Sequence, residues 1–344
     1  MMQRICGRDA SNQTDMYGFR RSALLNFFLG LVAGCILMYF NDRISRYASK
    51  FYEHVEHKVS DKEGQLAKRI KENVRVFCWI MTSKKNTMSK AVHINNTWAS
   101  KCNKHVFITA ESNSTLPNVD VGIKEGRENL WGKTKRAFQY IYKNELDNYD
   151  WFLKADDDTY VILENLRFML LAYSPKEPIY FGCKFKPFVK QGYMSGGSGY
   201  VLSREAVRRF VAEAIPDSSR CKKSDSGAED AEIGKCLSNV GGRHRMLPFS
   251  PLSHFENNAS MPGWFKKYMY YPYKQGSECC SDHMISFHYV NIALLYAIHN
   301  LIYHIRPFGL ASTAINEKEN SAEPIDKLFE SAKEMAKAES MAHG

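Results

Sequence analysis

Short apolar segments alternate with amphipathic ones through the middle of the chain. The segments rich in β-branched and aromatic residues, which we predict to be strands, are 74–80, 106–108, 151–155, 179–182 and 200–202. Apolar residues recur at helical spacing after Leu130, after Leu163 and after Arg204, which predicts helices among the strands. This alternation predicts an α/β domain built on a mostly parallel sheet with helices on both faces.

Farther along the chain the pattern is less regular. Ile233 and Leu237 follow Glu229 and Asp230 at helical spacing, so we expect a short helix to begin at this acidic pair. Residues 286–290 alternate between polar and apolar side chains as a strand does. Residues 313–344 are charged and rich in Ala and Ser, which is typical of a solvated helix or a flexible tail without chemistry.

A long apolar stretch precedes these elements. Residues 23–40 contain no charged residue and approach the ~20 residues that a helix needs to span a bilayer. The residues after them form a poor cleavage site, which argues against a removable signal peptide. A buried helix in a cytosolic protein is the alternative. The expected organisation is a cytoplasmic tail (1–21), a transmembrane signal-anchor (22–40), a stem (41–72), a catalytic domain (73–312) and a charged tail (313–344).

Features beyond the apolar stretch indicate on which side of the membrane the domain lies. Asn95, Asn113 and Asn258 each begin an N-glycosylation triplet. Seven of the nine cysteines also lie beyond this stretch, as expected for a domain in an oxidising compartment. Together these features predict a lumenal domain on a single-pass type II membrane protein.

The seven cysteines beyond the apolar stretch cannot all pair within one chain. We predict the pairs Cys78–Cys102, Cys221–Cys236 and Cys279–Cys280, which leaves Cys183 free or joined to another chain. Because a vicinal disulfide is strained, Cys279 and Cys280 are also compatible with two half-cystines that pair elsewhere.

Bulk composition narrows the choice of partners. An apolar share of 44% can build a core, and a formal net charge of +10 suits an anionic substrate, a membrane surface or nucleic acid. The sequence has no long basic tract and no known nucleic-acid-binding motif, so we expect no nucleic-acid partner.

Three consecutive aspartates follow the predicted strand 151–155. Asp156, Asp157 and Asp158 place like charges at the end of a buried segment, which is costly unless a cation neutralises them. Mn²⁺ or Mg²⁺ suits carboxylate oxygens and can bring a diphosphate with it. The alternative is a polar turn that caps the next helix. Ligands of parallel sheets bind at the carboxyl ends of the strands, where this triplet falls.

Other side chains are candidates for the same site, each with a structural alternative. Asp230 could act as a general base or merely favour the start of a helix. His288 could be a third metal ligand or a structural histidine. Arg127 and Lys133 could neutralise phosphates or form a solvated face. Trp264 could stack on a sugar or fill a core.

Several segments, in order, resemble one family. They are W-F-L-K-A-D-D-D-T-Y-V (151–161), Q-G-Y-M-S-G-G (191–197), E-D (229–230), C-C-S (279–281) and S-F-H-Y-V (286–290). They resemble the core 1 β1,3-galactosyltransferases over about residues 74–310. The resemblance implies a glycosyltransferase A-type fold in the Golgi. It also implies transfer of galactose, with inversion, from UDP-galactose to GalNAc on Ser or Thr of a glycoprotein.

The resemblance further implies roles for single residues. Asp156, Asp158 and His288 match the ligands of Mn²⁺, with Mg²⁺ as the alternative. Asp230 matches the acidic residue expected to act as base, and Trp264 matches an aromatic residue at the acceptor site. Contacts to UDP are implied for Met81, Glu125, Gly126, Arg127, Lys133, Asp156, His288 and Tyr289.

Three departures from the family pattern lie toward the acceptor side. Gly132 stands where an aromatic residue usually precedes the lysine, Lys266 stands where a second tryptophan is common, and the segment between Cys236 and Trp264 is shorter. A β1,3-glycosyltransferase with another UDP-sugar or acceptor is therefore an alternative function, and a catalytically silent, chaperone-like paralogue is another. The oligomeric state, a homodimer included, is left open.

Overall fold

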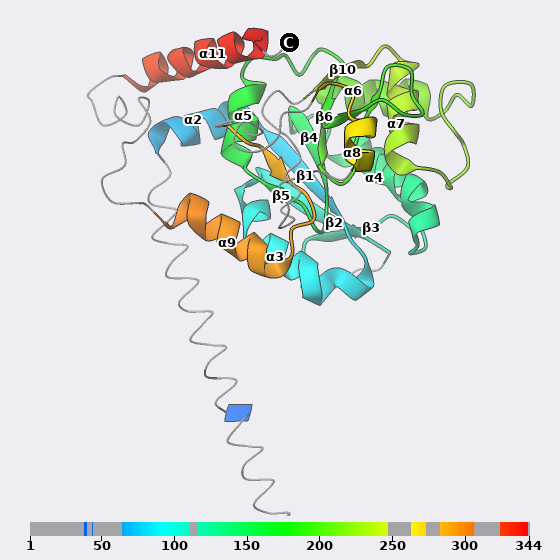
Figure 1. Ribbon diagram of the computed structural model, residues 1–344, viewed down its shortest axis with the longest axis horizontal. Coiled ribbons are helices and arrows are strands. Elements are labelled where there is room, and N and C mark those ends of the chain that lie inside the picture. Colours follow the sequence, from blue (N-terminus) through cyan, green and yellow to red (C-terminus); the bar gives the residue numbers. More distant parts are fainter. Residues whose placement is uncertain are drawn as a thin grey trace, which may run out of the picture. The chain divides into compact units, whose positions relative to one another are not determined.

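The computed structural model describes residues 64–110, 116–246, 263–272, 283–305 and 324–342, together with Met38, Tyr39 and Arg43. The chain divides into two compact units, Met1–Glu63 and Gly64–Gly344, and the second contains the sheet and helices labelled in Figure 1. Most of the predicted signal-anchor (22–40) and stem lies outside the described residues. Among the residues that are described, no helix combines the length and the apolar character needed to cross a bilayer.

A seven-stranded sheet forms the centre of the second unit, in the order β10-β6-β9-β4-β1-β2-β3. Its strands are β1 (Val76–Met81), β2 (Lys104–Thr109), β3 (Asn118–Asp120), β4 (Trp151–Asp156), β6 (Ile179–Gly182), β9 (Tyr200–Ser203) and β10 (Arg243–Met246). Neighbours are parallel except at β9, which runs antiparallel to both β4 and β6. The mixed α/β architecture with a mostly parallel sheet, expected from the sequence, is confirmed.

Smaller elements surround this sheet. β5 (Tyr160–Val161) pairs with β11 (Ser286–Phe287), and β7 (Lys184–Phe185) pairs with β8 (Tyr193–Met194), both antiparallel. The α-helices in the described ranges are α2 (Gln65–Asn73), α3 (Val92–Asn95), α4 (Leu130–Asn144), α5 (Leu163–Leu170), α6 (Arg204–Arg209), α7 (Glu229–Ser238), α8 (Gly263–Tyr268), α9 (Ile292–Tyr303) and α11 (Ile325–Ala342).

The core lies on both faces of the sheet. Along the fully buried strand β1, side chains belong alternately to two apolar clusters, beginning with Val76 in one and Phe77 in the other. Residues of α4, α6 and α7 pack in the Phe77 cluster, and residues of α2, α5, α9 and α11 pack in the Val76 cluster (Figure 1). A strand covered on both faces needs an apolar residue at every position, which explains the continuous apolar run in the sequence.

Two helices pack against the core from outside the predicted bounds of the catalytic domain (73–312). Within the tail predicted to be flexible or solvated, α11 buries Leu328, Ala332 and Ala336 against the core. At the other end, α2 buries Leu66 and Ile70, so the compact unit begins at Gly64 rather than at residue 73. Both helices are rich in charged residues, and their buried apolar residues are four positions apart, on one narrow face.

The predicted strand 286–290 is also shorter than expected. β11 ends at Phe287, and Tyr289 adopts a positive φ of 59°, which a regular strand does not allow. The N–H of Val290 then donates a hydrogen bond to the carbonyl oxygen of Asp158 (2.8 Å). The chain therefore turns onto the aspartate segment, and this turn places His288 beside it.

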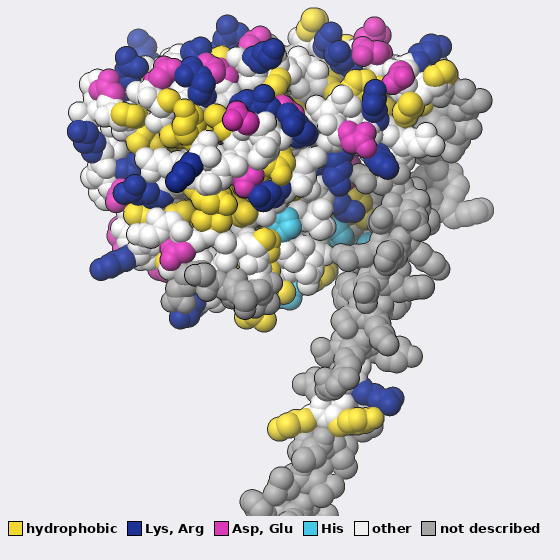
Figure 2. Space-filling view, turned by 180° about the vertical axis from the view of Figure 1, so that it is seen from behind, with side chains coloured by type: hydrophobic (Ala, Val, Ile, Leu, Met, Phe, Trp, Pro, Cys, Tyr) yellow, Lys and Arg dark blue, Asp and Glu magenta, His cyan; other side chains and the backbone are white. Residues whose placement is uncertain are grey.

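Surface charge is mixed on the face drawn in Figure 2. Lys and Arg side chains are interspersed there with Asp and Glu rather than gathered in one tract. The cationic side chains on this face therefore do not by themselves mark a binding surface.

Candidate active site

The carboxyl ends of the central strands open into a pocket of about 930 Å³. Met81 ends β1 and Asp156 ends β4, and the two residues are partners in the sheet register. Three segments supply the lining: residues 81–86, residues between 125 and 133, and residues 156–158. This is the edge at which open α/β sheets bind their ligands.

The pocket brings together most of the residues for which the family resemblance implies UDP contacts. Those in its lining are Met81, Glu125, Gly126, Arg127, Lys133 and Asp156. His288, Tyr289, Asp230 and Trp264 are not part of this lining within the described chain. The prediction of a common site thus holds geometrically for the first group, while contact with UDP stays a prediction.

One wall of the pocket carries Lys133 and Arg127. The Lys133 side chain is only 1% exposed, so the alternative of a solvated face is wrong for this residue. Its Nζ donates to Glu125 Oε2 (3.0 Å) and to the carbonyl oxygen of Thr82 (3.1 Å). Arg127 follows Gly126, whose φ of 138° favours glycine. The pocket lining therefore includes one ion-paired ammonium, from α4, and one guanidinium, from the residue after Gly126.

The three aspartates line the same pocket. Oδ1 of Asp156 accepts a hydrogen bond from Nζ of Lys154 (2.6 Å), and Oδ1 of Asp158 lies 3.6 Å from Nε2 of His288. Burial, with the charge of Asp156, raises the pKa of Asp158 to about 6. Carboxylates crowded in this way repel one another, and a bound cation would relieve that repulsion.

Asp156, Asp158 and His288 offer carboxylate oxygens and one imidazole, a donor set that fits Mn²⁺ or Mg²⁺. Within the described ranges, no three or more His, Cys, Asp or Glu side chains are already grouped around one metal position. The Asp158–His288 pair is in place, whereas Asp156 faces Lys154. The donor chemistry is therefore suitable, and the metal itself stays a prediction.

Two glycines between β8 and β9 explain how His288 and Asp230 reach this edge. A Cβ at Gly197 would lie 2.0 Å from Cε1 of His288, so only glycine allows the imidazole to lie against the loop. The N–H of Gly196 donates to Oδ2 of Asp230 (3.3 Å). The loop thus contacts two candidate residues from distant parts of the chain.

Glu229 and Asp230 begin α7 and are held differently. Oε1 of the buried Glu229 accepts hydrogen bonds from Tyr200 (2.6 Å) and Thr134 (3.0 Å). Oδ1 of Asp230 accepts from the N–H of Ala231 (2.9 Å). Burial raises the pKa of Asp230, although the backbone N–H donors act in the opposite direction. A raised pKa makes this carboxylate a better proton acceptor than a solvated one.

Lys154 is a buried cation that was not among the residues predicted from the sequence. Its Nζ donates to Asp156 and to the carbonyl oxygen of Gly196 (3.1 Å), and lies 3.9 Å from Oε2 of Glu229. Burial acts to lower the pKa of Lys154, but the charges of Asp156 and Glu229 outweigh it and the pKa is raised. A lysine inside the apolar run 151–155 is the signal that could have revealed it.

The predicted acceptor residue lies on another element. Trp264 is on α8, is 45% exposed, and packs edge-on against Phe265 and Tyr268. The Phe265 side chain is fully buried, which fixes the helix. Because the indole is exposed, the alternative that Trp264 fills a core is wrong. Its contact with an acceptor stays a prediction.

Two of the three predicted disulfides are confirmed. Cys78–Cys102 joins β1 to the segment before β2, and Cys221–Cys236 joins a loop to α7. Cys183 is free and buried. Cys279–Cys280 and the glycosylation candidates Asn113 and Asn258 lie outside the described residues. The third candidate, Asn95, is half-buried and contacts Nε2 of His105 through its Oδ1 (2.9 Å); its glycosylation stays a prediction.

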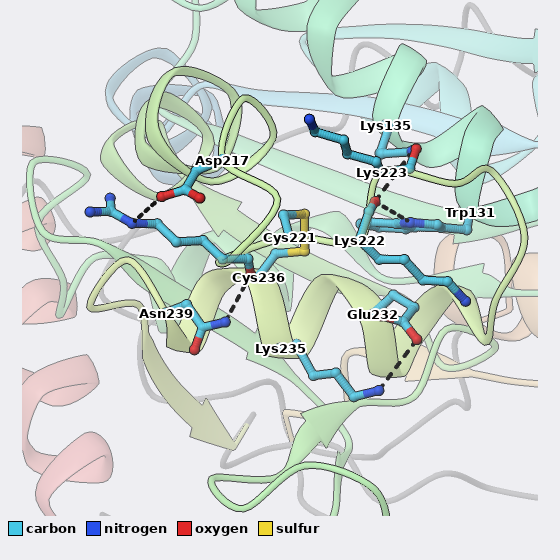
Figure 3. Close-up of a disulfide and its surroundings, with 12 residues drawn as sticks. Trp131, Lys135, Asp217, Cys221, Lys222, Lys223, Glu232, Lys235, Cys236 and Asn239 are labelled. Carbon is cyan, nitrogen blue, oxygen red and sulfur yellow. Dashed lines mark hydrogen bonds and ion pairs between the residues drawn. A yellow bond between two sulfur atoms is a disulfide. The ribbon is translucent and has the colours of Figure 1, made fainter.

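The loop closed by Cys221–Cys236 leads into the acidic pair and rests on α4 (Figure 3). Trp131 Nε1 donates to the carbonyl oxygen of Lys222 (3.2 Å), and Lys135 Nζ donates to that of Lys223 (2.6 Å). A Cβ at Gly132 would lie 2.7 Å from Cβ of Asp225. The glycine that departs from the family pattern therefore leaves room for this loop.

Comparison with known proteins agrees with these features. Residues 71–262 match the family model described as Fringe-like. The chain is 43% identical over 259 residues to glycoprotein-N-acetylgalactosamine 3-beta-galactosyltransferase 1 of Xenopus laevis, which covers 72% of this chain and 71% of that protein. It is 29% identical over 182 residues to human beta-1,3-glucosyltransferase, covering 52% and 35% of the two chains.

A more distant match is chondroitin sulfate synthase 3 of mouse, 26% identical over 204 residues that cover 53% of this chain and 23% of that protein. The Fringe-like match spans more than half of the chain, and the Xenopus relative matches most of both sequences. The resemblance to core 1 β1,3-galactosyltransferases noted from the sequence is thereby confirmed. The chain belongs to the Fringe-like family and is a glycosyltransferase.

Proposed function

We propose that this protein is an inverting β1,3-galactosyltransferase. It transfers galactose from UDP-galactose to the 3-hydroxyl of GalNAc α-linked to Ser or Thr of a glycoprotein. The observation that carries the proposal is the pocket at the ends of β1 and β4, whose lining combines the three aspartates with Arg127 and Lys133. The identity to the Xenopus relative over most of both chains supports this choice of donor and acceptor.

The donor side of the reaction belongs to this pocket. Asp156, Asp158 and His288 would hold Mn²⁺ or Mg²⁺, which supplies charge stabilisation for the departing diphosphate. Arg127, which lines the same pocket, binds the diphosphate, and Lys133 holds the neighbouring turn through its ion pair with Glu125. These cationic groups lie where negative charge develops as UDP leaves.

Asp230 supplies the proton acceptor. Its carboxylate removes the proton from the acceptor's 3-hydroxyl as that oxygen attacks the anomeric carbon of galactose. Attack comes from the face opposite UDP, so one displacement converts the α-linked donor into a β-linked product. Trp264 offers an exposed indole face for the acceptor sugar.

We further propose the location and attachment expected from the sequence. The apolar residues 22–40 form a signal-anchor, and the catalytic unit lies in the lumen of the Golgi as a single-pass type II protein. Protection of the catalytic unit from added protease in sealed vesicles, and its loss after detergent, is the expected result. Cleavage in intact vesicles would contradict the topology.

A matrix of donors and acceptors tests the proposed activity. The full-length protein in detergent is incubated with UDP-galactose, UDP-glucose or UDP-GlcNAc and with a GalNAc-peptide, a GlcNAc-peptide or the bare peptide. We expect release of UDP and formation of a β1,3-linked disaccharide only for UDP-galactose with the GalNAc-peptide. EDTA and Asp158→Ala should abolish transfer. Transfer that persists in EDTA would contradict the metal site.

Two alternatives are decided by the same matrix. The identity to human beta-1,3-glucosyltransferase favours UDP-glucose as the first alternative donor to examine. A silent, chaperone-like paralogue would bind no UDP in the presence of Mn²⁺. Retention of Asp156, Asp158, Asp230 and His288 counts against this second alternative.

A further inference from the structure

The central aspartate of the triplet has different surroundings from its neighbours. Oδ2 of Asp157 accepts hydrogen bonds from Thr82 Oγ1 and from Asn86 Nδ2, both at 2.8 Å. Oδ1 forms an ion pair with Nζ of Lys90 at 2.9 Å. Three of the roughly four acceptor sites of a carboxylate are thus occupied by protein donors. The Asp157 side chain is 11% exposed, which leaves little of it open to solvent.

All three donors come from one segment, residues 82–90, which we call the β1 rim. The rim follows β1 directly and contains a short 3₁₀ helix, Lys84–Asn86, and all but the last residue of a π-helix, Thr87–Ala91. Thr82 is at its start, Asn86 at its middle and Lys90 at its end. One carboxylate therefore holds the rim at three points along its length.

The part of the rim between these points faces the pocket. Lys84 and Lys85 are exposed, and both belong to the pocket lining together with Thr82, Ser83 and Asn86. A nucleoside diphosphate is a dianion or trianion, and ammonium groups on a fixed segment attract it at a smaller entropic cost than the same groups on a loose one. Lysines alone do not form such a site; the rim must hold them at the pocket.

We infer that Asp157 is a positioning residue for the donor. It holds the β1 rim so that Lys84 and Lys85 face the diphosphate of the nucleotide-sugar, while its neighbours in the triplet face the metal. This inference rests on the proposed function, because it assigns the pocket a nucleotide-sugar. In this assignment, two carboxylates of the triplet, Asp156 and Asp158, face the metal, and the third, Asp157, binds only protein groups of the β1 rim.

A double-mutant cycle on UDP binding tests the inference. Full-length wild type, Asp157→Asn, Lys90→Met and the double variant are titrated with UDP at saturating Mn²⁺ by calorimetry. Each single change should weaken UDP binding roughly tenfold, and the double change should be no worse than either, because both remove the same ion pair. At saturating UDP-galactose, kcat should fall less than about threefold, as expected when only donor binding is impaired.

The two lysines are tested separately, because Asp157→Asn would also alter the conformation of the rim and would not show which of its side chains binds UDP. Lys85→Ala removes an exposed side chain and should weaken UDP binding roughly tenfold, with the thermal unfolding midpoint unchanged. Lys84→Ala should act in the same direction. Lys176→Ala, which removes another exposed lysine that does not belong to the pocket lining, is the matched control for net charge and should leave UDP binding unchanged.

The outcomes separate this inference from the proposed function. Failure of the wild type to bind UDP would overturn the proposed function and this inference with it. A wild type that binds UDP while Lys84→Ala and Lys85→Ala bind equally well would overturn the inference alone. Additive effects in the cycle, together with an increased Mn²⁺ requirement in Asp157→Asn equal to that of Asp158→Asn, would instead make Asp157 a metal ligand.

Discussion

The two acidic clusters of the site differ in how their charge is offset. Asp156 and Asp158 remain 33% and 29% exposed, and cationic or ring nitrogens face each of them. Glu229 is buried among hydroxyl donors, and Asp230 accepts from backbone N–H groups. The first cluster is therefore open to a ligand cation, whereas the second is more deeply buried. Burial raises the pKa of both of its carboxyls, although the charge of Lys154 acts in the opposite direction.

Lys154 connects the two clusters. It bonds Asp156 on one side and approaches Glu229 on the other, from a position that is almost fully buried. One cation thus restrains both a predicted metal ligand and the residue next to the predicted base. Changes to one cluster should for this reason be measured for their effect on the other.

The largest expected effect separates proton removal from donor binding. Asp230→Asn keeps the shape of the side chain but removes the proton acceptor, so kcat should fall by about 10²–10⁴. UDP affinity with Mn²⁺ should stay within about threefold of wild type, because the residue is not in the pocket lining. Steady-state kinetics and calorimetry check this result. A large loss of UDP affinity with little change in kcat would place Asp230 on the donor side.

Replacing the shared cation should affect both clusters. Lys154→Met leaves Asp156 and Glu229 without their buried partner, and breaking such a pair costs about 3–5 kcal/mol of unfolding free energy. We expect activity to fall by roughly 100-fold, since the position of Asp156 and the environment of Glu229 both change. Denaturant unfolding and transfer assays are the measurements. Wild-type stability in this variant would mean that Lys154 is not needed to hold the two carboxylates.

A glycine substitution examines the contact between the loop and the imidazole. Gly197→Ala would place a methyl group against His288, so the ring must move away from Asp158. The Mn²⁺ concentration for half-maximal activity should rise by about tenfold. Gly132→Ala is the matched comparison, because its added methyl group meets Asp225 instead. If the Mn²⁺ concentration for half-maximal activity rose equally in the two variants, His288 would not be a metal ligand.

The smallest expected effect is on the folding stability of the protein, and it involves two histidines outside both acidic clusters. Burial lowers the pKa of His244 and of His299 to about 4, so the folded state keeps them neutral. Their folded-state pKa values lie below the unfolded value of about 6.5, so stability is full above pH 6.5 and declines as the pH falls toward 4. Thermal unfolding between pH 7 and 4 checks this. His244→Gln and His299→Gln should each flatten that dependence.

The fold could be predicted where local pattern decides the structure. β1 is continuously apolar and β4 largely so because both faces of the sheet are covered, and α4 is amphipathic because one face is buried. All three elements were predicted from these patterns. The orientation of β9 could not be predicted, because a four-residue apolar strand reads the same in either direction. The packing of α11 was missed because three small or apolar residues in a charged helix give a weak signal.

The site could be predicted as a set of residues but not as a set of contacts. The resemblance identified Asp156, Asp158 and Asp230, since it preserves their order in the chain. It could not show that Gly196 donates to Asp230 or that the rim surrounds Asp157, because those contacts depend on how distant segments meet. Lys154 carried a signal in the sequence, as a lysine within an apolar strand, but its contacts with Gly196 and Glu229 could not be predicted for the same reason.

The way α2 and α11 pack has a practical consequence for anyone preparing a secreted form of the enzyme. Arg69 on α2 pairs with Asp326 on α11 (3.0 Å), and both helices cover the same apolar cluster. A truncation that started at residue 73 or stopped near 312 would strip these helices and leave the cluster open to water. Expression boundaries should therefore begin no later than Gly64 and extend through Ala342, with affinity tags added outside them.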